Sequence, residues 1–257
     1  MKYYLDTEFI EGFHRPFLGR RRHFVDLISI GIVAEDGREY YAVSKDFNPA
    51  KADKWVVQNV LDKIVAEHQQ DARSTVQNWT IEDVMHNHGK SNKQIATEIH
   101  EFINPHFADD LLLHSEGYWK QHNIIEIAPD KECPFFIWRS RPEFYGYYSD
   151  YDWVVFCSLF GRMIDLPEGF PMYCRDLKQQ LDEVAEIVIQ RIPDGQPKTE
   201  NWSKAKIMKL DYHYPKEING HNALDDARWN KKLHEFIIHK RVNLLGPDFA
   251  QLKRSKF

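Results

Sequence analysis

The chain has 257 residues, of which 42% are hydrophobic, and this length suits one large folded domain or two small ones. Its formal net charge of −5 excludes a global basic field for nucleic-acid binding, so a nucleic-acid partner would need a local basic patch or bound metal ions. Cys133, Cys157 and Cys174 form no C-x-x-C pair, which argues against a disulfide framework and a cysteine zinc site.

The start of the chain lacks the apolar core of a signal peptide, and no run approaches the roughly 18 apolar residues of a membrane span. Together with the separated cysteines, this predicts a soluble protein of the cytoplasm that has no membrane partner.

The first predicted strand covers about residues 2–8 and carries two carboxylates. A short apolar run precedes Asp6 and Glu8, which are two residues apart and therefore point to the same face. Two carboxylates this close raise each other's pKa unless a cation lies between them, and a hard divalent ion such as Mg²⁺ or Mn²⁺ prefers such oxygen ligands. A solvated strand end is the alternative interpretation.

Residues 13–23 follow as an irregular segment with a concentrated basic run, Arg15, Arg20, Arg21 and Arg22. Arginines so soon after the acidic strand are suited to track the backbone of a nucleic acid, because phosphate contacts supply sequence-independent affinity. A solvated loop explains the same run equally well.

Strands and helices then alternate along the chain. Apolar runs predict strands over 27–33, 39–43, 144–148 and 172–174, and Asp36-Gly37 is a hairpin turn signal between the first two. Apolar residues at helical spacing predict helices over about 53–66, 95–103, 153–160, 176–190 and 222–240. This alternation predicts a mixed α/β fold. Because no G-x-G-x-x-G or G-K-[ST] loop is present, nucleotide binding of the Rossmann or P-loop kind is not expected.

A second acidic site lies where the strand at 144–148 meets the next helix. Ser149, with Asp152 three residues later, fits a capping box, and acidic residues favour helix N-termini. A carboxylate at this junction also lies at the carboxyl end of a strand, where open α/β sheets place their sites. Both interpretations of Asp152 remain open at this point.

The start of the last helix is the third acidic site. Asn222 and Asp225 are suited to cap this helix, which leaves Asp226 one position further round and able to face the sheet. His221 stands just before the helix. A histidine in a loop is usually a surface group, but beside a metal held by carboxylates its pKa near 6.5 would suit it to accept a proton from an attacking water.

Together, Asp6-x-Glu8, Tyr151-Asp152 and His221-x-x-x-x-Asp226 resemble the three motifs of the DEDD exonuclease superfamily. The histidine is similar to that of the DEDDh branch, because the tyrosine branch would place Tyr at position 222. Residues 4–11, 27–44 and 151–155 more closely resemble the bacterial 3′–5′ exoribonucleases known as RNase AS, the polyadenylate-specific type. The similarity covers about residues 1–65, 91–104, 143–177 and 219–238, with insertions at about 13–23, 67–90 and 105–142.

This resemblance implies an RNase H-like fold, a mixed β-sheet flanked by helices, in a single exonuclease domain over residues 1–240 followed by a basic tail over 241–257. It implies hydrolysis of single-stranded RNA from the 3′ end to 5′-mononucleotides with two Mg²⁺ or Mn²⁺ ions. Two cations about 3.5–4 Å apart can neutralise both the attacking and the leaving oxygen of a phosphodiester. A homodimer is also implied.

The resemblance also implies the role of each site residue. Asp6 would bind both ions, Glu8 and Asp226 would hold the ion on the nucleophile side, and Asp152 would support the other ion. His221 would orient and deprotonate the attacking water.

Contacts to substrate are less defined. Thr7 and Phe9 flank the acidic pair, and a ring there could stack on a base, although Phe9 could equally be a core residue. The resemblance implies that Ser29 lies near the terminal sugar or base, and the basic run suggests that Arg20, Arg21 and Arg22 contact phosphates. Nothing identifies a reader of the 2′-hydroxyl, so DNA is the alternative substrate. A non-catalytic RNase H-like nucleic-acid-binding protein is a further alternative, but such a protein would be expected to lose one of the five motif residues.

Overall fold

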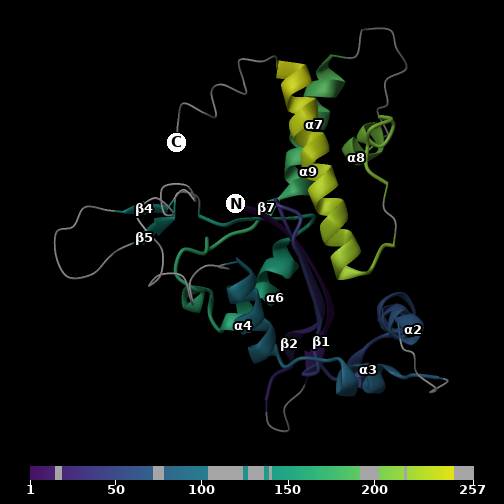
Figure 1. Cartoon of the computed structure of the whole chain (residues 1–257). Coiled ribbons are helices and arrows are strands. Elements are labelled where there is room, and N and C mark those ends of the chain that lie inside the picture. Colours follow the sequence, from purple (N-terminus) through teal and green to yellow (C-terminus); the bar gives the residue numbers. More distant parts are fainter. Residues whose placement is uncertain are drawn as a thin grey trace.

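The computed structural model describes residues 1–14, 19–71, 78–103, 124–126, 136–138, 141–191, 203–216 and 219–245. Its centre is a five-stranded sheet in the order β3-β2-β1-β6-β7 (Figure 1). The strands are β1 (Lys2–His14), β2 (Arg22–Ala34), β3 (Glu39–Val43), β6 (Glu143–Gly146) and β7 (Arg175–Asp176). The strands β1, β2 and β3 pair antiparallel, whereas β1, β6 and β7 pair parallel. The predicted α/β fold with a mixed sheet is therefore confirmed.

Helices cover both faces of the sheet (Figure 1). One face packs against α4 (Asn92–Ile103) and α6 (Asp150–Phe160). The other packs against α7 (Leu177–Gln190) and α9 (Ala223–Leu245), with α8 (Lys204–Met208) against α7. On the same face as α9 lie α1 (Lys54–Val56), the π-helical turn η2 (Val57–Leu61), α2 (Asp62–Asp71) and α3 (Ile81–Asn87). The remaining short elements are η1 (Pro49–Lys51), η3 (Met163–Asp165) and a hairpin of β4 (Ile124–Glu126) and β5 (Phe136–Trp138).

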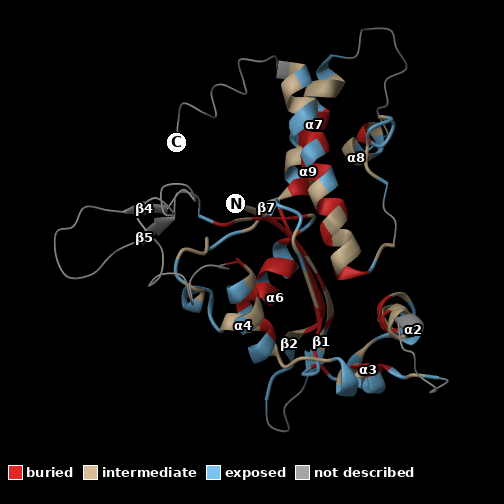
Figure 2. Ribbon diagram, viewed as in Figure 1, coloured by how far each residue is buried: buried red, intermediate tan, exposed pale blue. Residues whose placement is uncertain are grey.

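Side chains alternate between the two faces of β1, so the helices on the two faces contact different residues of this strand. Leu5 packs against α4 and α6, whereas Tyr4 packs against α7 and α9. Because successive side chains point to opposite faces, Asp6 and Glu8 share the face of Tyr4, and Thr7 shares that of Leu5. Buried residues concentrate where the helices meet the sheet (Figure 2). The strand therefore presents two carboxylates to α9 and a threonine to α6.

Two glycines let these helices approach the strands closely. A Cβ on Gly31, which pairs with Asp6, would lie 2.2 Å from the carbonyl oxygen of Ala223 at the start of α9. A Cβ on Gly146 would lie 2.7 Å from the Cβ of Ser149, just before α6. Because no larger residue fits at either position without displacing its neighbour, glycine is what brings both helix N-termini to the level of the acidic strand.

The structure corrects part of the insertion at 13–23. This segment was expected to be irregular, but β1 and β2 continue as a ladder to the pair His14 and Arg22. The final short strand is also displaced, since Arg175–Asp176 form it rather than 172–174.

The observed helices also differ from the predicted ones in their positions and ends. The stretch 67–90, expected to be a polar insertion, contains α3, which a capping box of Thr80 and Asp83 begins. The last helix continues past residue 240 to Leu245, into the predicted basic tail. Most of the insertion at 105–142 lies outside the described residues.

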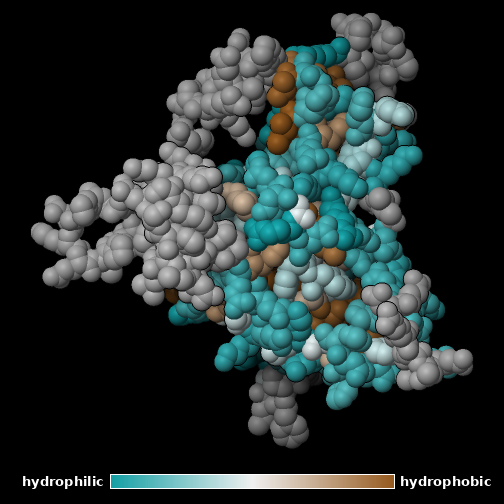
Figure 3. Space-filling model, viewed as in Figure 1, coloured by the Kyte–Doolittle hydropathy of each residue, from teal (hydrophilic) through white to brown (hydrophobic). Residues whose placement is uncertain are grey.

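The surface in the view of Figure 3 is mainly hydrophilic, with hydrophobic residues gathered in separate patches. Within the described ranges, no helix combines the length and the apolar character needed to cross a membrane.

Candidate active site

Three carboxylates meet where β1 passes the N-terminus of α9. Asp6 and Glu8 come from β1 and Asp226 from the first turn of α9, and one oxygen of each lies within 4.8 Å of the others. We call these three residues the carboxylate group. The alternation of β1 and the close approach of α9 at Gly31 bring them together.

Burial and repulsion between carboxylates favour protonation of Asp6 and Glu8 when no cation is bound. Burial raises the pKa of Asp6 well above its usual range, and Asp152, Glu8 and Asp226 raise it further. The pKa of Glu8 is raised to about 8, mainly by burial and then by Asp226 and Asp152, while Lys63 opposes the shift. Oxygen ligands of like charge at this spacing fit a hard divalent cation such as Mg²⁺ or Mn²⁺, because the cation would remove their repulsion.

Asp152 stands apart from the carboxylate group and is held by β1 itself. Its Oδ1 accepts hydrogen bonds from the backbone N–H of Thr7 at 3.0 Å and from Thr7 Oγ1 at 2.6 Å. Burial raises the pKa of Asp152 to about 6, and both hydrogen bonds from Thr7 oppose this shift. Of the two interpretations left open for Asp152, the capping box is not formed, since the Ser149 side chain makes no cap hydrogen bond and Asp152 instead accepts from Thr7, between the two acidic positions of β1.

His221 lies beside Asp226 because of a backbone contact. Its N–H donates to Asp226 Oδ2 at 2.8 Å, and the residue has a left-handed φ of 69°. Its ring meets the indole of Trp55 edge to face, with centroids 4.8 Å apart. Trp55 lies on α1 and is 52% exposed, although the sequence indicated only an apolar residue at helical spacing. The packing of α1 near the start of α9, which periodicity does not reveal, places it here.

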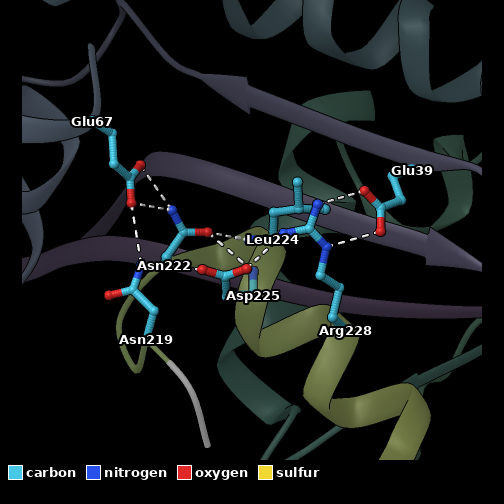
Figure 4. Close-up of polar contacts among 7 residues, drawn as sticks. All are labelled: Glu39, Glu67, Asn219, Asn222, Leu224, Asp225 and Arg228. Carbon is cyan, nitrogen blue, oxygen red and sulfur yellow. Dashed lines mark hydrogen bonds and ion pairs between the residues drawn. The ribbon is translucent and has the colours of Figure 1, made fainter. Parts of the chain in front are cut away.

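The turn that carries His221 is fixed by Asn222 (Figure 4). Asn222 Oδ1 accepts from the backbone N–H groups of Leu224 and Asp225, both at 3.0 Å, so its predicted capping role is confirmed. Its Nδ2 donates to both carboxylate oxygens of Glu67 on α2, at 2.8 and 2.9 Å. The turn is thereby tied to α2.

Asp225 anchors the first turn of α9 through its side chain (Figure 4). Arg228 donates to Asp225 Oδ1 at 2.6 Å and to the two oxygens of Glu39 on β3 at 2.8 and 2.6 Å. Asn219 also donates to Asp225, at 3.1 Å. The expected capping role of Asp225 is therefore wrong, because its carboxylate binds these side chains instead of backbone N–H groups.

Two further residues support the site and were missed from the sequence. Lys63 on α2 donates to the carbonyl oxygen of Gly220 at 2.5 Å. The buried Asn230 donates to the carbonyl oxygen of Leu5 at 3.0 Å, directly before Asp6. A polar residue one helical turn after Asp226, on the inner side of a predicted helix, was a usable signal for Asn230.

The residues predicted to contact substrate occupy different surroundings. Phe9 stacks on Tyr151, with ring centroids 5.7 Å apart. Ser29 is 1% exposed and pairs with Glu8 across the ladder. Arg20, Arg21 and Arg22 are exposed near the far end of the β1–β2 ladder, roughly 20 Å from Glu8 at about 3.3 Å per residue.

The strand order, the helices on both faces and the carboxylate group on the central strand define an RNase H-like α/β protein. A family model described as the 3′–5′ exoribonuclease Rv2179c-like domain matches residues 2–238.

The chain is also similar to two curated proteins of Mycobacterium tuberculosis, 3′–5′ exoribonuclease Rv2179c of strain H37Rv and 3′–5′ exoribonuclease MT2234.1 of strain CDC 1551. Each is 31% identical over 179 residues, which is 70% of this chain and 73% of the relative. The chain therefore belongs to the 3′–5′ exoribonuclease Rv2179c-like family, and the prediction of an exoribonuclease is confirmed at this level.

Proposed function

We propose that the chain is a metal-dependent 3′–5′ exonuclease of the DEDDh branch that hydrolyses single-stranded RNA from its 3′ end to 5′-mononucleotides. The observation that carries this proposal is the carboxylate group, in which Asp6, Glu8 and Asp226 offer oxygen ligands within 4.8 Å of one another. Membership of the family supports RNA as the substrate and degradation in the 3′-to-5′ direction. The resemblance of residues 4–11 and 27–44 supports the polyadenylate-specific RNase AS type.

The ligands fit two Mg²⁺ or Mn²⁺ ions. When bound, such ions neutralise charge on the attacking and leaving oxygens of a phosphodiester. Asp6, Glu8 and Asp226 would hold one ion, and Asp6 with Asp152 would hold the other. Asp6 would take part in holding both ions, as the resemblance implies, and the charges of the other three carboxylates all act on it. Thr7 keeps Asp152 oriented by donating two hydrogen bonds to one carboxylate oxygen.

His221 acts as the general base that accepts a proton from the attacking water. The backbone hydrogen bond to Asp226 keeps the residue next to the carboxylate group whichever way its ring turns. The edge-to-face contact with Trp55 limits the orientations of the ring, and the bonds of Asn222 to Glu67 hold the turn beneath it. Imidazole suits this step because, among unperturbed side chains, it is the one that gains and loses a proton near neutral pH.

His221→Ala is expected to lower kcat about 10²- to 10⁴-fold with little change in melting temperature, because the variant loses proton transfer but no buried contact. Single-turnover hydrolysis of a 5′-labelled oligoribonucleotide measures the rate. His239 is an exposed histidine further along α9, so His239→Ala should keep the wild-type rate. A rate near wild type in His221→Ala would exclude the general-base role.

Replacing Thr7 by valine is expected to move the acid limb of the pH–activity profile to higher pH. Valine keeps the shape of the side chain but removes the hydroxyl that lies 2.6 Å from Asp152 Oδ1. Because that hydrogen bond lowers the pKa of Asp152, now about 6, its loss lets the carboxylate take up a proton at higher pH. Thr7→Ser retains a hydroxyl and should keep the wild-type limb. Coincident profiles for threonine and valine would contradict this role of the hydroxyl.

The substrate is tested with 3′-ended RNA and DNA homopolymers in Mg²⁺ or Mn²⁺. We expect RNA to shorten one nucleotide at a time, with polyadenylate fastest, and a blocked 3′ end to resist. Equal turnover of RNA and DNA would remove the ribonuclease assignment in favour of an exodeoxyribonuclease. Binding without hydrolysis of either polymer would favour the non-catalytic alternative, and activity that survives Asp6→Ala would overturn the assignment of the carboxylates.

We further propose that residues 1–240 form one exonuclease domain, that the chain acts as a homodimer, and that it resides in the cytoplasm. Cys157 and Cys174 are free thiols, which suits a reducing compartment. Analytical ultracentrifugation tests the dimer, and a monomer at all concentrations would exclude it.

A further inference from the structure

The ladder between β1 and β2 extends well beyond the rest of the sheet. β1 pairs with β6 only up to Tyr4, whereas its pairing with β2 continues to His14 opposite Arg22. A bulge between Glu8 and Phe9 separates the acidic part of β1 from this extension. We call residues 9–14 with 22–27 the arm. Among the residues that the structure describes, β1 has a ladder partner on only one side along the arm.

Rings line one face of the arm and continue onto the start of α6. Phe9 stacks on Tyr151 with ring planes at 14°. The His23 ring contacts two other rings edge to face. Its centroid lies 6.4 Å from that of Tyr151 and 5.3 Å from that of Phe13. The guanidinium carbon of Arg21 lies 4.1 Å from the ring centroid of Phe13. These five side chains form a continuous series, which we call the aromatic strip.

Phe9 is half-buried against the core, but the rest of the strip is more open to solvent. Tyr151 is 47% exposed, Phe13 is 56% exposed, and the His23 side chain is 41% exposed. Rings held at this exposure leave apolar surface in water, so burying them under a partner would be favourable. Aromatic faces and guanidinium planes are the groups on which nucleobases stack in proteins that bind single strands.

The charges near the strip indicate what the partner is. Arg20, Arg21 and Arg22 concentrate positive charge at its far end, although the whole chain has a net charge of −5. Glu11 is an acidic residue on the arm, and its carboxylate lies 3.5 Å from His23 Nε2, so phosphates would pass on the arginine side. Exposed rings beside arginines match a single-stranded nucleic acid, in which bases and phosphates alternate.

We propose that the aromatic strip binds the bases of the RNA strand upstream of the 3′-terminal nucleotide, while Arg21 contacts its phosphates. This inference rests on the proposed function, since the terminal nucleotide has to occupy the carboxylate group. Phe9 and Tyr151 are direct chain neighbours of Glu8 and Asp152, so the strip begins beside the acidic residues, although Phe9 lies on the opposite face of β1 from the carboxylate group. Among the described residues, the pairing of β1 with β6 ends at Tyr4, and beyond it the RNA strand would pass from the face of the carboxylate group to the face of the strip.

The first test compares kcat/KM for an adenylate dodecamer with that for the dinucleotide. In the double variant Phe13→Ala/His23→Ala, the ratio of the two values is expected to fall about tenfold or more, the usual effect of losing base stacking. Tyr212→Ala is the matched control, because this ring is 95% exposed and lies outside the arm. An unchanged ratio in the double variant would overturn the proposal.

The second test measures binding without catalysis. Anisotropy of a labelled single-stranded RNA, recorded with the full chain in chelator over a range of salt, gives the slope of log Kobs against log salt. Phe13→Ala should weaken binding without altering the slope. Arg21→Ala should reduce the slope by about 0.7, the value for one phosphate contact to a single strand. The exposed Arg162, bound to Asp165, provides the control Arg162→Ala, which should keep the slope.

The two tests distinguish this inference from the proposed function. If the wild-type protein hydrolyses neither RNA nor DNA, the proposed function fails, and the anisotropy slopes still decide whether the strip binds RNA. If the wild-type protein degrades RNA but Phe13→Ala and Arg21→Ala bind like wild type, the strip assignment alone fails.

Discussion

Asp6→Asn is expected to abolish hydrolysis and yet to stabilise the metal-free protein. Burial raises the pKa of Asp6, and Asp152, Glu8 and Asp226 raise it further, so its ionised form is unfavourable in the folded chain without a cation. Asparagine has nearly the same shape but supplies no anionic ligand. We expect the rate to fall about 10³-fold or more, as when a central electrostatic contact to the reacting group is lost. A gain of about 1 kcal/mol would raise the melting temperature by about 2–4 °C.

The stabilisation by asparagine should grow with pH. A carboxyl group whose folded pKa is raised contributes stability that is fully present below its unfolded pKa and is lost as the pH rises through the folded pKa. For Glu8 that window runs from its usual pKa of 4.5 to about 8, and the pKa of Asp6 is shifted in the same direction. The wild-type protein in chelator should therefore lose stability across this range, while the variant loses less.

Calorimetry in chelator and in Mg²⁺ checks both parts of this prediction. Mg²⁺ should raise the melting temperature of the wild type more than that of Asp6→Asn. Asp36→Asn is the matched control. Burial raises the pKa of Asp36, but the hydrogen bonds and the charge of Arg38 together outweigh burial and lower the pKa overall, so asparagine there should not stabilise. A lower melting temperature of Asp6→Asn in chelator would contradict the repulsion argument.

Gly31→Ala is expected to damage both stability and activity. The added Cβ would lie 2.2 Å from the carbonyl oxygen of Ala223 and 2.4 Å from the Cα of Leu224, so the start of α9 has to move. Overpacking of this kind costs about 1–3 kcal/mol, and backbone neighbours put the cost at the upper end. The same shift displaces Asp226, and a misplacement of about 1 Å can cost on the order of 10²-fold in rate.

Chemical denaturation gives the stability of Gly31→Ala, and kcat at a temperature where it is fully folded gives the activity. Gly220→Ala is the contrast, because nothing lies within 4 Å of the added Cβ, and its free energy of unfolding should match or slightly exceed that of the wild type. If Gly31→Ala and wild type agree in both measurements, α9 is not held against β2 in the way described.

The acidic residues of the site could be placed from the sequence because their positions depend on local geometry. The two-residue period of a strand puts Asp6 and Glu8 on one face, and the cap at Asn222 fixes where the last helix begins. Asp226 then follows at a position that faces the sheet.

Tertiary contacts decided what sequence patterns left open. Trp55 and Glu67 lie in a helical region that was predicted, but only the packing of that region against the start of α9 brings them to the turn of His221. Asp152 suited either a cap or a site contact, and its carboxylate accepts two hydrogen bonds from Thr7, which sequence patterns do not reveal. The outer end of the arm, residues 13, 14, 22 and 23, was taken for part of an irregular insertion, because its exposed rings and arginine lack the buried apolar pattern by which strands are recognised.

Both acidic helices take their position from the same strand, α9 on its Tyr4 face and α6 through Thr7 on the opposite face. If β1 slipped by one residue against its neighbours, Asp6 and Glu8 would turn away from α9, and Thr7 would take their place. A chain folded in the wrong register would then be inert, not merely slow. Hydrolytic activity therefore reports directly on correct strand pairing, and a preparation with reduced specific activity should contain fewer competent molecules rather than many impaired ones.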